Sequence, residues 1–400
     1  MDAGFAGDQR LIDGLFSSAG RIDPHAVLRG SGQAGCRYAI ARDVLHSPNF
    51  IGPVVSSDAE MFRMFRRWML TLDGERHRTM RRAFGGCFTP RRTPAYRARI
   101  ERRAGALLDA VADCGAMDLV ADFARPLPLA VICEVLGVPD ADVPWIDAQM
   151  TTLNLGFAHQ RELDYLEAAG VAAVEMQHYF GELLDARRSG PREDLISALA
   201  RDLPGDPETR ADVLANCVLF INAGHVTTTS LVAAGTLALL RHPDQLARLR
   251  AEPALIGGAV EELLRLVTPT SSVMTRAVAD DEVGGCPFAA GEHRFMFLLA
   301  ANRDPEVFAD PDRLDVTRDP NPHLSFSAGR HYCLGAPLAR LHGEVAITAL
   351  LARLPRLRLD GEPQWRSAMP LRELEALPVA WDPARLRHRE ADAVVAGGAE

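Results

Sequence analysis

The sequence predicts a mainly α fold with small β-sheets, arranged as one domain over residues 1–384 with a mobile tail over residues 385–400. Two observations favour this class. Helical periodicity dominates from Arg99 to Leu240, whereas the strand-like segments are short and lie elsewhere. No shift in composition and no linker divides the 400 residues, so a second domain is not expected despite the length.

Two helices carry clear stop signals. The segment Ala130–Gly137 ends at a glycine with Pro139 beyond it, a combination that is typical of a helix C-terminus. An amphipathic run from Leu163 to Arg188 is closed by the Gly-Pro pair at positions 190 and 191. A further helix is predicted from about Leu255 to Leu266.

The span between Pro207 and Pro243 contains no proline and predicts one long helix. Asp206 and Glu208 near its start and Arg241 near its end suit the helix dipole. At 1.5 Å per residue this helix would be on the order of 50 Å long. It is apolar on nearly every side, so we expect it to be the central buried helix.

The strand-like segments are short and can form only small sheets beside the helices. They are Gly35–Ile40, Asp281–Val283 followed by a turn at Gly284 and Gly285, Arg294–Leu299 and Leu377–Trp381.

Composition excludes several classes of function. The net charge of −9 argues against nucleic acid as a partner, and the chain contains no lysine. Pyridoxal and Schiff-base chemistry, phosphate-loop hydrolysis and kinase-type phosphoryl transfer depend on a lysine, so these classes are excluded. The chain has seven cysteines without a close pair, no apolar leader and no long apolar run. These features predict a cytoplasmic protein that does not bind a membrane.

Two local patterns have competing interpretations. Gly30–Gly35 matches the dinucleotide fingerprint, but no convincing strand precedes it and too few residues follow before Pro48 for a βαβ unit. The arginine-rich stretch from Arg63 to Arg103 could pass for a nucleic-acid patch, yet apolar core positions interrupt it. We therefore expect neither a nucleotide cofactor nor a nucleic acid at these segments.

Cys333 lies in the most informative stretch of the chain, Phe326–Arg340. Gly329 and Gly335 flank it and allow the backbone to approach a bulky flat group, and an apolar helix with proline in its first turn follows. A sulfur at a helix N-terminus is expected as the thiolate, the form that an axial haem ligand needs. The alternative is that Cys333, like most free cysteines, is a small buried hydrophobe.

The middle of the long helix departs from the usual composition of a buried helix. Hydroxyl residues occupy positions 227–230, and Gly224 costs about 1 kcal/mol relative to alanine. Threonine hydroxyls can bond the preceding turn and bend the helix. Such departures are expected at functional sites. The alternative is ordinary packing against polar neighbours.

Both stretches resemble motifs of the cytochrome P-450 family. The stretch around Cys333 is similar to Phe-Gly-x-Gly-x-x-x-Cys-x-Gly, with Ser327 in place of the first glycine. The resemblance runs from about residue 50 to residue 381 and implies a single-domain cytochrome P-450 fold. It also implies haem b, held through Cys333, with Phe326 and Gly335 beside it.

The block at 223–230 is similar to the family's oxygen-binding groove, Ala-Gly-x-(Asp/Glu)-Thr-Thr. By this resemblance Ala223 and Gly224 make room for dioxygen, and Thr227 orients the oxygen and its protons. Val226 stands where the family has an acid that relays protons. We therefore expect protons to arrive through Thr227, a water chain, His225 or a polar group of the substrate.

The resemblance also assigns residues that hold the haem propionates. His77 and Arg81 match the family's His-x-x-x-Arg segment, and Arg276 and His331 are the other candidates. Buried propionates need such partners. Any one of these four alone would more often be an ordinary surface residue.

Glu262 and Arg265 lie three residues apart, so both lie on one face of a helix and can form an ion pair. Their position matches the family's buried Glu-x-x-Arg pair, which locks the fold around the cysteine loop. The resemblance predicts a third member, Arg313, with Arg318 as a possible substitute.

The family implies a monooxygenase that hydroxylates a small organic substrate, here in bacterial secondary metabolism, using dioxygen. Electrons would come from a ferredoxin and a ferredoxin reductase, and Asn222, Ser272 and Val273 would touch the substrate. Val226 leaves open an alternative reaction, oxidative coupling or cyclisation without oxygen insertion. A haem-binding protein without turnover is the third possibility.

Overall fold

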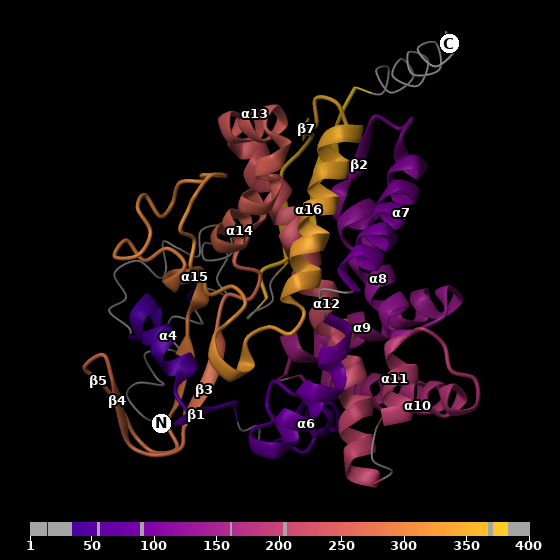
Figure 1. Cartoon of the computed structure of the whole chain (residues 1–400), viewed down its shortest axis with the longest axis vertical. Helices are drawn as coiled ribbons and strands as arrows, with labels where there is room; N and C mark the ends of the chain where they lie inside the picture. The colour runs from indigo at the N-terminus through magenta and orange to yellow at the C-terminus, as the bar shows by residue number, and fades with distance from the viewer. Residues whose placement is uncertain are drawn as a thin grey trace.

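A computed structural model describes residues 34–53, 57–88, 92–160, 162–202, 206–366 and 371–382, together with Gly14. The predicted tail at 385–400 and most of the pattern at 30–35 lie outside these residues. Across the described residues the chain is mainly helical with small sheets, which confirms the predicted fold class (Figure 1).

The α-helices follow one another through most of the chain. Their bounds are α4 Tyr38–His46, α5 Glu60–Phe65, α6 Gly74–Gly85, α7 Thr93–Val111, α8 Pro126–Leu136, α9 Val143–Ala158, α10 Leu163–Ser189, α11 Leu195–Asp202, α12 Pro207–Arg241, α13 Pro243–Ala251, α14 Ile256–Val267, α15 Leu298–Ala301 and α16 Ala336–Arg353. A π-helical turn at Val120–Ala124 precedes α8.

The strands are short and lie mostly in the second half of the chain. Their bounds are β1 Phe50–Ile51, β2 Ala116–Asp118, β3 Val273–Ala277, β4 Asp281–Val283, β5 Cys286–Phe288, β6 His293–Met296, β7 Arg358–Leu359, β8 Gln364–Trp365, β9 Leu374–Ala376 and β10 Pro378–Ala380.

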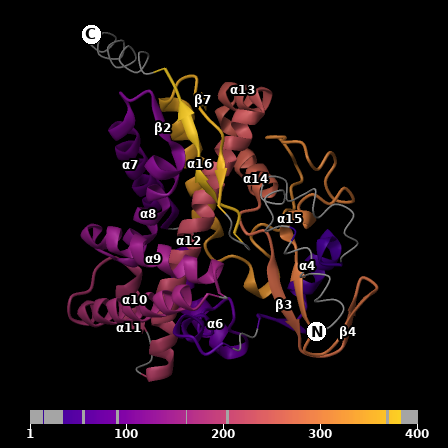
Figure 2. The same ribbon diagram turned by 180° about the vertical axis from the view of Figure 1, so that it is seen from behind.

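Helix α12 runs through the middle of the molecule, as predicted (Figures 1 and 2). The Asp206 side chain caps its start by accepting a hydrogen bond from the Thr209 N–H at 2.8 Å. The helix extends over 35 residues to Arg241. It is the one helix in the described chain that is long and apolar enough to cross a membrane, but 78% of its apolar window is buried inside the protein. It is therefore a core helix.

The helices α8–α11 lie on one side of α12, and α13, α14 and the sheet of β1, β3 and β6 lie on the other (Figures 1 and 2). Helices α8, α14 and α16 pack directly on α12. The predicted helix stop at Gly137 is confirmed, because this glycine adopts the left-handed conformation at the end of α8. The predictions for α10 and α14 are also confirmed, to within a residue at each end.

The sheet of β1, β3 and β6 is antiparallel. Its register places Arg276 opposite His293, so β3 carries one of the predicted haem-binding residues. The predicted strand at 281–283 is present as β4, and after the predicted turn at Gly284 and Gly285 it pairs with β5 in a hairpin. The late strand is present as β10.

One strand prediction was wrong, and a second was confirmed only over its first half. Residues 34–36 form a 3-10 turn and α4 begins at Tyr38, so Gly35–Ile40 is not a strand. The buried residues Tyr38, Ala41 and Val44 recur at helical spacing, a pattern that becomes visible only when the window extends past Ile40. In the second case the strand β6 ends at Met296, and residues 298–301 form α15.

Candidate functional site

Cys333 lies in a tightly folded loop just before α16. Its N–H donates to the Phe326 carbonyl at 2.9 Å, which closes the loop. Gly329 has φ +64°, and a Cβ at this position would lie 2.3 Å from the Leu45 carbonyl oxygen, so only glycine fits. Ser327, where the family has a glycine, also has a positive φ, of 59°.

The thiol of Cys333 lies in a mixed environment. Burial raises its pKa, whereas the backbone N–H groups of Gly335 and Ala336 and the charges of Arg81 and Arg340 lower it. Burial outweighs the others, so the helix terminus alone does not hold this sulfur as the thiolate that we expected. A bound metal cation would supply the additional positive charge that is needed to keep the sulfur as the thiolate, because metal coordination deprotonates a thiol.

An opening interrupts the buried surface of α12 halfway along the helix. Ala223 is exposed and Thr227 is half-buried, although most of the surrounding helix is buried. The Thr227 hydroxyl donates to the Ala223 carbonyl at 2.6 Å, so its oxygen remains available as an acceptor. Val226 is buried and is only 4% exposed, so it offers no polar group there.

Gly224 has a second role that its sequence motif did not indicate. A Cβ at this position would lie 3.1 Å from the Ile132 side chain of α8. The glycine therefore lets α8 approach α12 closely, next to the opening at Ala223.

Buried side-chain nitrogens without hydrogen-bond partners lie on α6 and on β3. The Nε2 atom of His77 in α6 is buried and has no hydrogen-bond partner. The Nε atom of Arg276 in β3 is likewise buried and has no partner. The His77 ring lies 4.4 Å from that of His331, two residues before the cysteine. Burial and neighbouring positive charges lower the pKa of His77 to about 4. Arg81 has no ion-pair partner in the part of the chain that the structure describes.

Unsatisfied buried donors are costly, so this arrangement fits an anionic group that is bound between α6, β3 and the cysteine loop. Of the four predicted propionate ligands, His77, Arg81 and His331 are neighbours, while Arg276 lies on β3 opposite His293. One contact competes with this role, since His331 Nε2 lies 3.5 Å from a carboxylate oxygen of Asp73.

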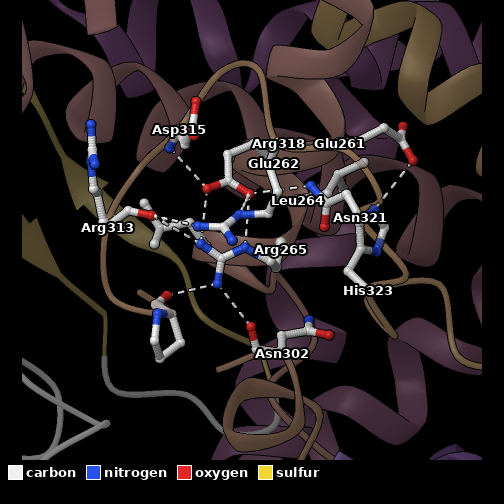
Figure 3. A network of polar contacts seen from close by, with 12 residues as sticks. Glu261, Glu262, Leu264, Arg265, Asn302, Arg313, Asp315, Arg318, Asn321 and His323 are labelled. Carbon is white, nitrogen blue, oxygen red and sulfur yellow. Dashed lines mark hydrogen bonds and ion pairs between the residues drawn. The ribbon is translucent and has the colours of Figure 1, made fainter. Parts of the chain in front are cut away.

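Glu262 and Arg265 are fully buried and form the centre of a polar network (Figure 3). Two hydrogen bonds of 2.8 and 2.9 Å join their side chains. Glu262 also accepts from the Asp315 N–H at 3.0 Å. Arg265 donates to the carbonyls of Asn302 and Pro311 at 2.9 and 2.7 Å. The pair therefore ties α14 to the segment that leads to the cysteine loop.

The third side chain of this network belongs to Arg318, and the assignment of Arg313 was wrong. Arg318 Nε donates to Glu262 Oε2 at 3.0 Å. Arg313 contributes only its carbonyl, which accepts from Arg265 at 3.2 Å, while its side chain is exposed and points away from the network (Figure 3). The Arg313 carbonyl also accepts from Arg318 at 3.3 Å, so Arg313 contributes only backbone to the network.

The predicted substrate contacts differ in how accessible they are. Asn222 is nearly buried and donates to Asn154 of α9 at 2.6 Å. Ser272 is only 2% exposed, and its hydroxyl has no partner. Val273 at the start of β3 is half-buried. Of the three, Val273 presents the most surface.

Two groups of polar residues were missed in the sequence. Asp212 of α12 is 2% exposed and accepts from Arg67 and Arg76, both at 2.7 Å. It fastens the segment before α6 to the central helix. A second ion pair joins Arg340 to Glu261 beside the cysteine loop. In both ion pairs the two partners are far apart in the sequence, so no local spacing of residues could have predicted them.

Comparisons with known proteins give a consistent result. The family model described as Cytochrome P450 matches residues 167–359. The chain is 40% identical over 307 residues to the biotin biosynthesis cytochrome P450 of Bacillus subtilis, covering 76% of this chain and 78% of that protein. It is 40% identical over 323 residues to 6-deoxyerythronolide B hydroxylase of Saccharopolyspora erythraea, covering 78% of each chain.

Solved structures of cytochrome P450 proteins are similar to this structure. The structure of P450BioI in complex with a hexadecenoic-acid-ligated acyl carrier protein has a TM-score of 0.82 and 37% identity, covering 87% of this chain and 91% of that chain. The structure of CalO2 has a TM-score of 0.83 and 30% identity, covering 92% and 98%.

Proposed function

Because the chain belongs to the cytochrome P450 family of bacterial monooxygenases, we propose that it binds haem b through Cys333 and hydroxylates a small organic substrate in secondary metabolism. The electrons would come from a ferredoxin and its reductase in the cytoplasm. One observation carries the assignment of the site: buried nitrogens without hydrogen-bond partners lie on α6 and β3, and the His77 ring of α6 lies beside His331 of the loop that presents the half-buried Cys333.

Different residues of this chain would ligate the iron and bind the propionates. Cys333 would ligate the iron, and the backbone N–H groups of Gly335 and Ala336 would support its negative charge. His77 and Arg276 would hold the propionates through the nitrogens that now lack partners. The bound haem supplies the activation of dioxygen.

Thr227 would handle protons at the opening in α12. Its hydroxyl oxygen can accept a hydrogen bond from a water molecule, while its proton is held by the Ala223 carbonyl. The hydroxyl can donate toward the opening only when it releases that carbonyl. Val226 next to it can neither hold nor move a proton, so each proton would reach Thr227 through water, from His225 or from the substrate.

This buried valine also supports a second candidate reaction, oxidative coupling or ring closure of the substrate. Coupling would remove two hydrogen atoms from the substrate and insert no oxygen, so both oxygen atoms of dioxygen would leave as water, while the reduction of dioxygen would take up as many protons as in hydroxylation. Product analysis separates the two reactions, since only hydroxylation adds one oxygen atom.

The reduced carbonyl complex tests the ligand assignment. We expect the wild-type protein to show the red-shifted Soret band of thiolate ligation. The Cys333→His variant should keep haem and lose this band, whereas Cys87→Ala and Cys286→Ala should retain it. An unchanged spectrum in Cys333→His would overturn the assignment. A panel of compounds screened for the spin-state change on water displacement would then identify the substrate class.

A further inference from the structure

A second ion pair lies next to the buried Glu262–Arg265 pair and was not expected. Glu261 of α14 accepts two hydrogen bonds from Arg340 of α16, from Nε at 2.7 Å and from Nη2 at 2.8 Å. His323 Nε2 lies 3.3 Å from the same carboxylate. The arrangement is the bidentate fork that arginine forms with a carboxylate, and it fixes the guanidinium plane.

The fixed guanidinium lies directly against the cysteine loop. Its carbon is 4.6 Å from the centroid of the Phe326 ring, a distance typical of a cation–π contact. The same arginine donates to the Tyr332 hydroxyl at 3.2 Å. Phe326 closes the loop through its carbonyl bond to the Cys333 N–H, and Tyr332 directly precedes the cysteine. Arg340 therefore touches both ends of the loop that presents the sulfur.

Both members of the pair are charged at neutral pH. Burial alone would raise the pKa of the Glu261 carboxyl, but hydrogen bonds from His323 and Arg340 lower it to about 2. The Arg340 charge lies beside the sulfur's loop, because its guanidinium contacts both Phe326 and Tyr332. The two charges oppose each other beside the cysteine, so removing either one leaves the other uncompensated.

We propose that Arg340 and Glu261 are positioning residues that hold the Cys333 loop and set the electrostatic potential at its sulfur. The pair would thereby adjust the reduction potential of the bound haem iron. This inference rests on the proposed role of Cys333 as the thiolate ligand. A positive charge near a site favours its reduced form, and a negative charge disfavours it.

The test is a spectroelectrochemical titration of the haem-loaded protein. Arg340→Gln removes the positive charge and should shift the midpoint potential to more negative values. Glu261→Gln removes the negative charge and should shift it to more positive values. The double variant should return toward the wild-type potential. Shifts of the same sign in both single variants, or no shift, would overturn the proposal, because a merely structural defect has no reason to change sign.

Two controls sharpen the result. Arg97 and Glu344 form a comparable pair of 2.6 Å between α7 and α16, one turn beyond Arg340, and their glutamine variants should leave the potential unchanged. Arg340→Lys keeps the charge, so its potential should stay near that of the wild type, even if Arg340→Gln fails to hold haem. A shift in Arg340→Lys in the direction and size expected for loss of the charge would contradict the electrostatic role.

The outcome also separates this inference from the proposed function. A wild-type protein without the thiolate Soret band would refute the haem-thiolate assignment itself. A wild-type protein that shows this band, with single variants that do not shift in opposite directions, would refute only the role of Arg340 and Glu261.

Discussion

Ser327 shows how one residue of the cysteine loop departs from what its backbone favours. Its φ of 59° lies in the left-handed region, where a residue with a Cβ is strained by about 1 kcal/mol. We expect Ser327→Gly to raise the unfolding free energy of the haem-loaded protein by roughly that amount, measured by thermal denaturation. Ser325→Gly is the matched control and should destabilise, because the Ser325 hydroxyl donates to the Leu264 carbonyl at 2.7 Å. Equal effects of the two changes would refute the strain.

Thr227 and Val226 carry the residue-scale prediction for catalysis. Thr227→Ala should divert electrons to peroxide, because the hydroxyl at the opening of α12 is lost. Val226→Glu supplies an acid and should keep or improve the yield of product per electron if the reaction is hydroxylation. If it is coupling, the acid should divert some product toward hydroxylation. The measurement is product per electron together with product identity. No change in Thr227→Ala would mean that the groove lies elsewhere.

At the scale of elements, the Glu262–Arg265 pair fastens α14 to the segment that precedes the cysteine loop. Glu262→Ala leaves a buried arginine unpaired, at a cost of roughly 3–5 kcal/mol. We expect insoluble or haem-free protein, measured as soluble yield and haem content. Arg318→Ala should have a similar but smaller effect, while Arg313→Ala should behave as the wild type because its side chain is exposed. A soluble, haem-loaded Glu262→Ala would contradict the structural role of this pair.

Two fully buried histidines, His225 and His342, contribute to the pH dependence of the stability of the whole molecule. Burial lowers the pKa of His225 and of His342 to about 4. Between the unfolded pKa of about 6.5 and these values, the unfolded chain binds protons that the folded chain does not. The unfolding free energy should therefore fall as pH falls through this window, by up to roughly 3 kcal/mol for each histidine. Urea titrations from pH 8 to pH 4.5 measure the fall.

His342→Gln separates one histidine from the other contributions to this slope. Glutamine can still donate to the Leu338 carbonyl that His342 Nδ1 contacts at 3.1 Å, but it does not titrate. The variant should lose less stability than the wild type over the same pH range. An identical slope would show that His342 is not buried in its neutral form.

The sequence by itself determined the features that depend on neighbouring residues. The long helix α12 follows from its cap at Asp206 and the absence of proline as far as Pro243, and the turn of α8 follows from Gly137. The loop around Cys333 could be predicted because its glycines and the start of the following helix lie within a few residues of the cysteine. Helix periods, caps and turns are set within a few residues, so a pattern of letters is enough to predict them.

Only the tertiary structure decided which distant side chains meet. Arg318, not Arg313, reaches Glu262 across 56 residues, and the choice depends on how the intervening backbone is oriented. The pairing of Arg340 with Glu261, and the opening beside Ala223 within a buried helix, arise in the same way. Such contacts form between segments that are distant in the sequence, so they depend on how whole helices pack. The direction of a side chain in a loop depends in turn on the hydrogen bonds that the loop backbone makes with those helices.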